Sequence, residues 1–276
     1  MQDNNEVKEN KIENPPLELE KEKIDEPNKE IKILGILCNW CSYAGADLAG
    51  TSRFQYSPTL RVVRVMCSGR VDPELILEGF KNGVDGILIG GCHLGDCHYI
   101  DGNYHAKHKI LYLQSILEKI GIDNRRLKLE WISAAEGKRF SEVVNDFSAE
   151  IKKLGKFKLT EEKKELLNSL IEVFTDFRVR WLIGNKLKVT EIGNVYGKKL
   201  TEEDYVKLLN ETVDAELLRK RILKTIEKEP HTAVEISKKL NVSSEEIMSN
   251  LTTLLSDRIV AMNIKHHDAY FVKEEA

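Results

Sequence analysis

Five cysteines lie within one stretch of the chain, and no cysteine occurs outside it. Cys38 and Cys41 form a C-x2-C pair, Cys67 stands alone, and Cys92 and Cys97 form a C-x4-C pair. Thiolates are soft ligands that suit an iron–sulfur cluster or a structural zinc ion. The spacing matches neither the paired motifs of a zinc ribbon nor the plant-type ferredoxin motif. The cysteines therefore predict a metal or cluster site, with zinc and iron–sulfur both open.

The residues around these cysteines favour a redox centre. Gly90, Gly91, Gly95 and Gly102 allow main-chain amides to approach sulfur closely, and hydrogen bonds to sulfur help to set a potential. A set of four thiolate ligands leaves one of the five cysteines over. We expect this extra thiol to lie beside the ligands or to act as a redox partner.

Histidines and an aspartate flank the cysteines. His93 and His98 have the residue type of Rieske ligands, but that site needs two histidines on one iron; hydrogen bonding or partner contact is expected instead. Asp96 is expected to cap a turn or to accept a histidine N–H. His105 and His108 begin the next predicted helix and are expected on the surface.

Three further side chains have expected roles near the thiols. Trp40 and Tyr43 are expected to shield the site from water, and Arg70 to offset the negative charge of thiolates. No Gly-rich phosphate loop, Ser-His-Asp set or paired carboxylates support other chemistry. A dithiol oxidoreductase that uses Cys38 and Cys41 leaves the other three cysteines unexplained.

Each cysteine group follows a short apolar run that predicts a buried strand. These strands cover residues 31–38, 60–66 and 84–90, and a fourth covers 125–133. Helices between them give a repeated β-α pattern, so the fold class is α/β with a doubly wound, flavodoxin-like parallel sheet of about four strands. Right-handed crossovers place the strands in the order 2-1-3-4. The cysteines then leave the carboxyl ends of neighbouring strands, where ligands bind in such sheets.

The predicted helices of this domain cover residues 44–49, 73–82, 105–121 and 136–155. Asp72 is the expected N-cap of the second helix and Pro73 its first residue. Its buried face is predicted to contain Leu75, Ile76 and Phe80.

The remaining chain divides into a tail and two further parts. Residues 1–30 are rich in charge and proline and predict a disordered acidic tail. Residues 156–214 predict a helical linker region, with a pattern over 160–197 that is helical and then less regular, and a short helix over 201–210. The first of these is predicted to pack through Leu166, Leu170, Ile171 and Phe174.

Residues 215–276 predict a winged-helix-like domain, with helices over 215–229, 232–241 and 243–257 and a hairpin that turns at 266–268. The usual partner of this fold is DNA. The third helix instead begins with Glu245 and Glu246, and phosphate contact needs cations there. We therefore expect a protein contact rather than nucleic acid.

Bulk properties bound the class of protein. The chain has 276 residues and a formal net charge of -3, which provides no overall basic field for nucleic acid or an anionic membrane. The polar N-terminal residues lead us to expect no signal peptide, and the sequence contains no run of about 20 apolar residues. A cytoplasmic location without a membrane partner is expected, where clustered thiols are more often ligands than disulfides.

The cysteine motifs resemble a known family. CNWCSYAGADLAG, RVVRVMCSGRVDPELILEGFKNGVDGILIGGCHLGDCHYIDGN and the helix that follows are similar to the delta subunit of the methyl-viologen-reducing hydrogenase of methanogenic archaea. The resemblance covers residues 31 to about 150. Domains of this kind also occur beside or fused to the flavin subunit of heterodisulfide reductase and formate dehydrogenases.

The resemblance implies a [2Fe–2S] subunit of an oxidoreductase complex without an active site of its own. It would pass electrons from a hydrogenase or formate dehydrogenase to the flavin subunit of heterodisulfide reductase, where electrons bifurcate. The implied ligands are four of the five cysteines, and the strand-end positions favour Cys67, Cys92 and Cys97 with either Cys38 or Cys41. The alternative is a zinc-stabilised adaptor or regulatory protein with a winged-helix interaction domain. The acidic tail and the long extension depart from the family pattern, and we hypothesise that the extension docks onto the reductase or hydrogenase.

Overall fold

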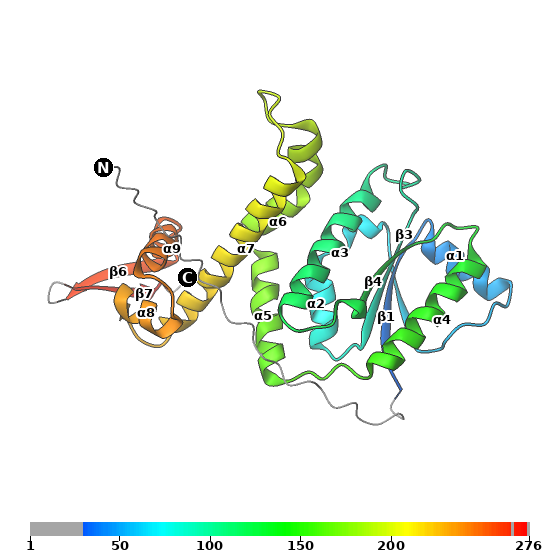
Figure 1. The fold of residues 1–276 in the computed structure, drawn as a ribbon, viewed down its shortest axis with the longest axis horizontal. Helices are drawn as coiled ribbons and strands as arrows, with labels where there is room; N and C mark the ends of the chain where they lie inside the picture. Colours follow the sequence, from blue (N-terminus) through cyan, green and yellow to red (C-terminus); the bar gives the residue numbers. More distant parts are fainter. Residues whose placement is uncertain (1–29, 266–267, 275–276) are drawn as a thin grey trace, which may run out of the picture.

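A computed structural model describes residues 30–265 and 268–274 (Figure 1). Its centre is a four-stranded parallel sheet in the order β2-β1-β3-β4, which is the predicted order. The strands are β1 (Ile33–Cys38), β2 (Leu60–Val65), β3 (Gly86–Gly91) and β4 (Leu127–Trp131). Of the predicted tail, only Glu30 lies within the described residues.

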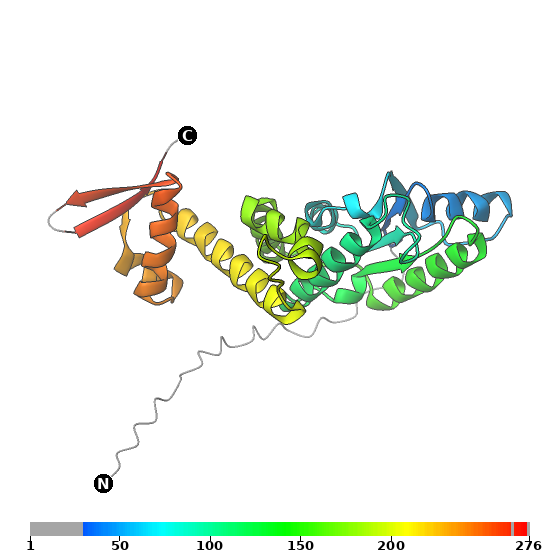
Figure 2. The same ribbon diagram turned by 90° about the horizontal axis from the view of Figure 1, so that it is seen from above.

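Helices cover both faces of the sheet, as expected for a doubly wound fold (Figures 1 and 2). One apolar core joins the sheet to α1 (Ser42–Thr51) and α4 (Gly137–Leu154). A second core, on the other face, joins it to α2 (Pro73–Lys81) and α3 (Gly102–Lys119). Short 3-10 turns, η1 (Ser68–Arg70) and η2 (Asn124–Arg126), complete this unit.

The second strand differs from the prediction of a buried strand. β2 lies at the edge of the sheet, and Val62 and Val63 are 41% and 49% exposed on its two faces. The two arginines of β2 and its open edge explain why this apolar run does not become fully buried. All six residues of β3, in the middle of the sheet, are buried.

α2 begins as predicted. The Asp72 carboxylate accepts a hydrogen bond from the Glu74 N–H at 3.1 Å, and Pro73 is the first helical residue. Ile76 and Phe80 are buried, but Leu75 is 49% exposed, so its predicted place on the buried face is wrong. Leu77 is buried in place of Leu75 on this face of the helix.

The extension adds helices to the face formed by α2 and α3. These are α5 (Glu161–Thr175), α6 (Phe177–Gly184), the π-helical turn η3 (Lys188–Ile192) and α7 (Glu202–Thr225). α5 packs beside α2, and its buried side chains are Leu167, Leu170, Val173 and Phe174. Leu166 and Ile171, which were also expected in the core, lie partly buried at its margin.

α7 is one continuous helix where the sequence pattern predicts two. The residues between the two predicted segments, 211–214, contain no glycine or proline to end a helix. Val213 among them is buried in the core shared with α3 and α5, which favours continuation.

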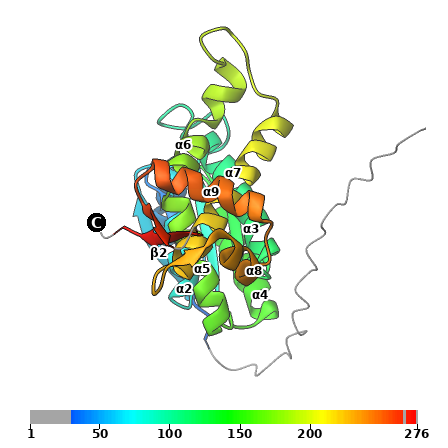
Figure 3. The ribbon, with the colours of Figure 1, turned by 90° about the vertical axis from the view of Figure 1, so that its left-hand side faces the viewer.

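The C-terminal unit has its own apolar core at the far end of α7 (Figures 2 and 3). It contains β5 (His231–Thr232), α8 (Ala233–Leu240), α9 (Ser244–Ser256), β6 (Val260–Lys265) and β7 (Asp268–Lys273). The strands form an antiparallel sheet in the order β5-β7-β6, so the predicted hairpin gains a third strand. Residues 266–267 of its predicted turn lie outside the described part.

Thr232 caps α8 and Ser243 caps α9. Thr232 accepts from the Glu235 N–H while the Glu235 carboxylate accepts from the Thr232 N–H, which completes a capping box. Within residues 30–265 and 268–274, no helix is both long and apolar enough to cross a membrane.

Candidate functional site

The carboxyl ends of three neighbouring strands bring the cysteines together, as predicted. Cys38 is the last residue of β1, and Cys67 and Cys92 follow β2 and β3 closely. Cys41 lies just before α1, and Cys97 lies in the loop between β3 and α3. Parallel pairing in register places these strand ends side by side.

The sulfur atoms form two neighbouring groups. Cys38 Sγ lies 3.7 Å and Cys41 Sγ 2.7 Å from Cys92 Sγ. Cys67 Sγ lies 3.8 Å from Cys97 Sγ. All five are free thiols. In the described residues, no three His, Cys, Asp or Glu side chains are arranged to hold a single metal ion.

The Cys38 sulfur is surrounded by hydrogen-bond donors. The contact with Cys92 lowers the pKa of Cys38 to about 6, and the main-chain N–H groups of Trp40, Ser68 and Cys41 act in the same direction against burial. The pKa of Cys92 is raised by the same contact with Cys38 and by burial. The pair therefore favours one negative charge, on the Cys38 sulfur, and one protonated thiol, at Cys92.

Ser42 holds the end of β1 in place. Its Oγ accepts a hydrogen bond from the Cys38 N–H at 2.9 Å and donates one to the Gly90 carbonyl at 2.8 Å. The side chain is fully buried, and it ties the first residue of α1 to both central strands.

The Cys67 sulfur lies against the beginning of α3. The Gly69 N–H donates to Cys67 Sγ at 3.4 Å, and burial raises the pKa of Cys67 to about 11. A Cβ at Gly102 would collide with the sulfur of Cys67 and crowd that of Cys97. This position therefore requires glycine, which supports the predicted role of Gly102 in bringing backbone close to sulfur.

His93 and His98 have partners other than the thiols. The His93 ring Nε2 lies 2.7 Å from a Glu136 carboxylate oxygen. That oxygen also accepts from the Ser133 N–H, and the two contacts hold the pKa of Glu136 at about 2. The His98 ring stacks on Trp40 with centroids 4.0 Å apart. The Asp96 N–H donates to the His93 carbonyl at 3.0 Å, within a turn of the loop.

His108 is not the surface residue that the sequence predicts. Its ring Nδ1 lies 2.6 Å from Lys186 Nζ, which also pairs with Glu202 at 2.6 Å. Burial and the neighbouring Lys186 charge lower the pKa of His108 to about 4. His105 is partly exposed, and its ring Nε2 lies 3.6 Å from the Asp101 carboxylate.

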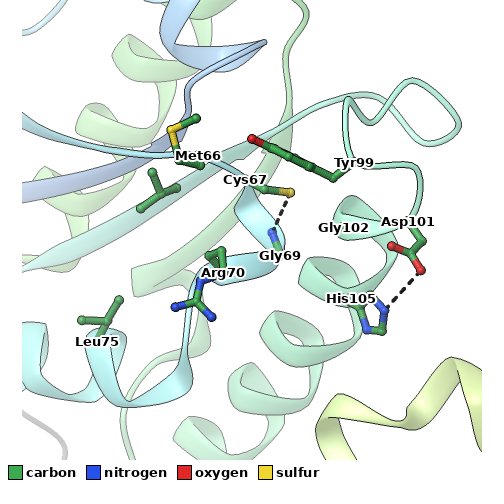
Figure 4. Close-up of a pocket in the computed structure, with 10 residues that line it drawn as sticks. Met66, Cys67, Gly69, Arg70, Leu75, Tyr99, Asp101, Gly102 and His105 are labelled. Atoms are coloured by element: carbon green, nitrogen blue, oxygen red, sulfur yellow. Dashed lines mark hydrogen bonds and ion pairs between the residues drawn. The ribbon is translucent and has the colours of Figure 1, made fainter.

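An open pocket of about 620 Å³ leads to the Cys67 sulfur (Figure 4). Met66, Leu75 and Tyr99 line it and are 54%, 49% and 44% exposed. Arg70 also lines this pocket, and its guanidinium is directed away from the Cys67 sulfur, so its expected role in charge balance stays a prediction (Figure 4).

The two aromatic residues expected to shield the thiols do so only in part. Trp40 is 42% exposed, although its ring covers His98. Tyr43 packs under the Arg64 guanidinium, which lies 4.9 Å from the ring centroid. Solvent therefore reaches the edge of the cysteine site beside Trp40.

Several residues of the site escape sequence reasoning. Asn103, fully buried, donates from Nδ2 to the His93 carbonyl at 2.6 Å and to the Cys92 carbonyl at 3.3 Å. Lys109 Nζ donates to the Gly69 carbonyl at 2.6 Å. Glu136 holds His93 from the start of α4. The position of Asn103 next to a cysteine motif could have suggested a role at the site. The sequence around Lys109 and Glu136 contains nothing that would have suggested one.

Comparison with known proteins places this chain in a family. Residues 33–155 match the family model described as methyl-viologen-reducing hydrogenase, delta subunit. A relative from Archaeoglobus profundus, the D-type iron-sulfur subunit of F420-non-reducing hydrogenase, is 54% identical over 133 residues, which are 48% of this chain and 94% of the relative. The chain belongs to this delta subunit family.

Two other relatives show the contexts in which this domain occurs. The D-type iron-sulfur subunit of the vhc F420-non-reducing hydrogenase of Methanococcus voltae is 51% identical over 134 residues, 49% of this chain and 93% of that protein. The A-type subunit of the ferredoxin/F420H2-dependent CoB-CoM heterodisulfide reductase of Methanosarcina acetivorans is 51% identical over 123 residues, 45% of this chain but 16% of that protein. The expected resemblance is confirmed, and the relatives are subunits of oxidoreductase complexes.

Proposed function

We propose that the five-cysteine site holds a [2Fe–2S] cluster and that the protein relays single electrons within a hydrogenase and heterodisulfide reductase complex. The observation that carries this proposal is the gathering of five free thiols at the carboxyl ends of three strands. The iron–sulfur names of the relatives support the kind of cofactor. A cluster of this type, when bound, accepts and releases one electron without a proton.

The sulfur separations support a specific ligand set. Two thiolates on one tetrahedral metal, with bonds of about 2.3 Å, lie about 3.8 Å apart. The Cys38–Cys92 and Cys67–Cys97 separations of 3.7 Å and 3.8 Å fit this requirement. We therefore assign one pair to each iron. Cys41, whose Sγ lies beside that of Cys92, is then left as the fifth thiol.

The surrounding chain fits a negatively charged group. Main-chain N–H groups lie against the sulfurs of Cys38 and Cys67, and the amino-terminal end of α3 meets Cys67 and Cys97 at Gly102. Hydrogen bonds and a helix N-terminus both stabilise thiolates. These residues hold and orient the site, and no side chain here is assigned to act on a substrate.

The electron path requires a partner at the carboxyl edge of the sheet. We place it at the pocket beside Cys67, where Met66, Leu75 and Tyr99 leave apolar surface exposed. The proposed donor is a hydrogenase or formate dehydrogenase, and the acceptor is the flavin subunit of the reductase, in an electron-bifurcating complex. The heterodisulfide reductase relative, which contains a similar domain, supports this acceptor. Each electron that the cluster accepts from the donor is passed to the acceptor, so the cluster returns to its starting oxidation state.

The C-terminal unit is proposed to be a winged-helix type of docking domain. Its elements follow the order helix, strand, helix, helix, strand, strand, and the edge strand β5 pairs with β7. Exposed Glu245, Glu246 and Met248 on α9, together with exposed Met262 and Ile264 on β6, favour a protein surface over DNA. Residues 156–276 lie outside the family match, so this unit would set a partner specific to this chain.

Metal analysis and spectroscopy of the anaerobically purified full chain test the proposal. About two irons per chain, visible absorption that bleaches on reduction, and an EPR signal of one unpaired electron are expected. Zinc without iron would refute the relay and make the zinc-stabilised adaptor the better explanation.

A further inference from the structure

Ser68 carries a hydroxyl without a hydrogen-bond partner in the described part of the chain. Its side chain is 0% exposed. The residue follows Cys67 directly, and its main-chain N–H lies against the Cys38 sulfur. Its Oγ packs over Gly91, where an added Cβ would lie 2.9 Å away, and Gly91 precedes Cys92. The hydroxyl therefore lies at the carboxyl end of β3, beside the Trp131 ring, on a residue that adjoins Cys67.

A second serine at the site shows what a satisfied hydroxyl looks like here. Ser42 is equally buried, but its Oγ accepts from the Cys38 N–H and donates to the Gly90 carbonyl. A buried hydroxyl that lacks such partners costs free energy, and native proteins rarely retain one without a role. The contacts made by the polypeptide thus explain Ser42 and leave Ser68 unexplained.

We propose that the Ser68 hydroxyl donates a hydrogen bond to a sulfur atom of the bound cluster and raises its reduction potential. This inference rests on the proposed function. The donor is present, buried and unpaired, and sulfur in a reduced cluster is a stronger acceptor because the added electron increases its negative charge. A hydrogen bond that strengthens on reduction favours the reduced state. Neither sequence pattern nor family membership assigns this role.

The first test compares reduction potentials of iron-loaded full-length variants by EPR-monitored titration. Ser68→Ala is expected to lower the potential, through a several-fold decrease in the one-electron reduction equilibrium, where a tenfold decrease equals about 59 mV. Ser68→Thr, which keeps a hydroxyl, is expected to stay nearer to the unsubstituted chain. Ser141→Ala is the matched control, because Ser141 is a buried serine whose Oγ donates to the Lys138 carbonyl on α4, away from the cysteines.

A second readout detects the hydrogen bond itself. Pulsed ENDOR of the reduced cluster in H2O and D2O reports exchangeable protons that couple to the unpaired electron. One strongly coupled proton is expected to disappear in Ser68→Ala and to persist in Ser141→Ala. An unchanged potential together with an unchanged proton spectrum would overturn the inference.

A third comparison uses the iron-free chain and does not depend on cluster loading. Thermal unfolding of iron-free Ser68→Ala is expected at the same temperature as the unsubstituted chain or higher, because no protein hydrogen bond is lost. Iron-free Ser42→Ala is expected to unfold at a lower temperature. Loss of iron from Ser68→Ala with unchanged iron-free stability also supports the role, whereas destabilisation as large as that of Ser42→Ala contradicts it.

The proposed function and this inference fail in distinguishable ways. Absence of iron from the unsubstituted chain refutes both together. Iron in the unsubstituted chain with no effect of Ser68→Ala on potential or proton coupling refutes the inference alone.

Discussion

Lys109 brings a positive charge to the turn that carries Cys67. Its ammonium donates to the Gly69 carbonyl at 2.6 Å, and the N–H of the same glycine donates to the Cys67 sulfur at 3.4 Å. Burial lowers the pKa of Lys109, while Asp72 and Cys67 act in the opposite direction. The lysine therefore both fixes Gly69 and favours negative charge at the cysteine.

Replacement of Lys109 by methionine is expected to lower the reduction potential of the iron-loaded protein. The reduced cluster carries one more negative charge, which Lys109 stabilises across a partly buried region. The expected decrease corresponds to about a tenfold change in the reduction equilibrium, or about 59 mV. EPR-monitored titration measures it. Lys109→Arg should keep most of the potential. An equal decrease in Lys119→Met, at the other end of α3, would contradict a local effect of Lys109.

Cysteine substitutions separate the ligands from the fifth thiol. We expect Cys41→Ser to keep about two irons per chain, and Cys38→Ser, Cys67→Ser and Cys97→Ser each to lose most of them. The reason is the pairing of Cys38 with Cys92 at 3.7 Å and of Cys67 with Cys97 at 3.8 Å. Iron analysis after anaerobic purification provides the measurement. If Cys38→Ser kept about two irons per chain and Cys41→Ser lost them, Cys41 would be the ligand and Cys38 the fifth thiol.

The cysteine site is predictable from sequence because it depends on the type and spacing of residues close together in the chain. The residues that contact and position the cysteines are not predictable in this way. Ser68 and Ser42 are both serines next to cysteine motifs, yet only the packed structure shows that the Ser42 hydroxyl is satisfied and that the Ser68 hydroxyl has no partner among the described residues. Glu136 lies 43 residues from His93 in the chain, and no pattern connects them until α4 packs on the sheet.

At the scale of elements, caps and strand order follow from sequence, whereas burial depends on position in the sheet. Asp72 caps α2 as predicted, and Thr232 and Ser243 cap α8 and α9, because a cap is a local hydrogen bond. The apolar residues of β2 predict a buried strand, but β2 is an edge. The continuity of α7 depends on the core around Val213, which the sequence does not display.

α5 is expected to be part of the structural core rather than a detachable linker. Phe174 on α5 is 1% exposed and packs 6.3 Å, between ring centroids, from Tyr112 on α3. Phe174→Ala leaves a cavity and should cost about 3–5 kcal/mol of unfolding free energy. Denaturant titration measures this loss. Phe177→Ala, at an aromatic residue that is 77% exposed, is the control. An equally small effect of both variants would show that α5 contributes little to stability.

The contact of α3 with the extension should make stability depend on pH through His108. Its folded-state pKa of about 4 lies below the unfolded value of 6.5. The unfolded chain therefore binds more protons between these values, so stability is full above about pH 6.5 and falls as the pH falls toward 4. The contribution is about 2 kcal/mol after allowance for partial exposure. His108→Gln should remove this part of the pH dependence in chemical denaturation. An unchanged slope between about pH 4.5 and 6.5 would contradict it.

At the scale of the whole molecule, the extension presents an exposed loop toward the same end as the cysteine loop (Figure 1). Val195 and Tyr196, between η3 and α7, are 93% and 84% exposed. The loop is nevertheless ordered by hydrogen bonds, because Asn194 Oδ1 accepts from the N–H groups of Tyr196 and Lys198 at 2.9 Å and 3.0 Å. Apolar side chains held in solvent by a fixed loop indicate a contact surface.

A partner that covers the cysteine edge is therefore expected to contact this loop as well. Tyr196→Ser is predicted to weaken association with the proposed hydrogenase or reductase subunits by about thirtyfold, which corresponds to about 2 kcal/mol for an aromatic anchor. Iron content and reduction potential should not change, because the loop does not touch the cysteines. Binding to purified partner subunits, compared with Phe177→Ser as a similarly exposed control on α6, provides the measurement. Equal binding by both variants would assign partner contact to the cysteine edge and the C-terminal unit alone, and the loop would then have no part in assembly.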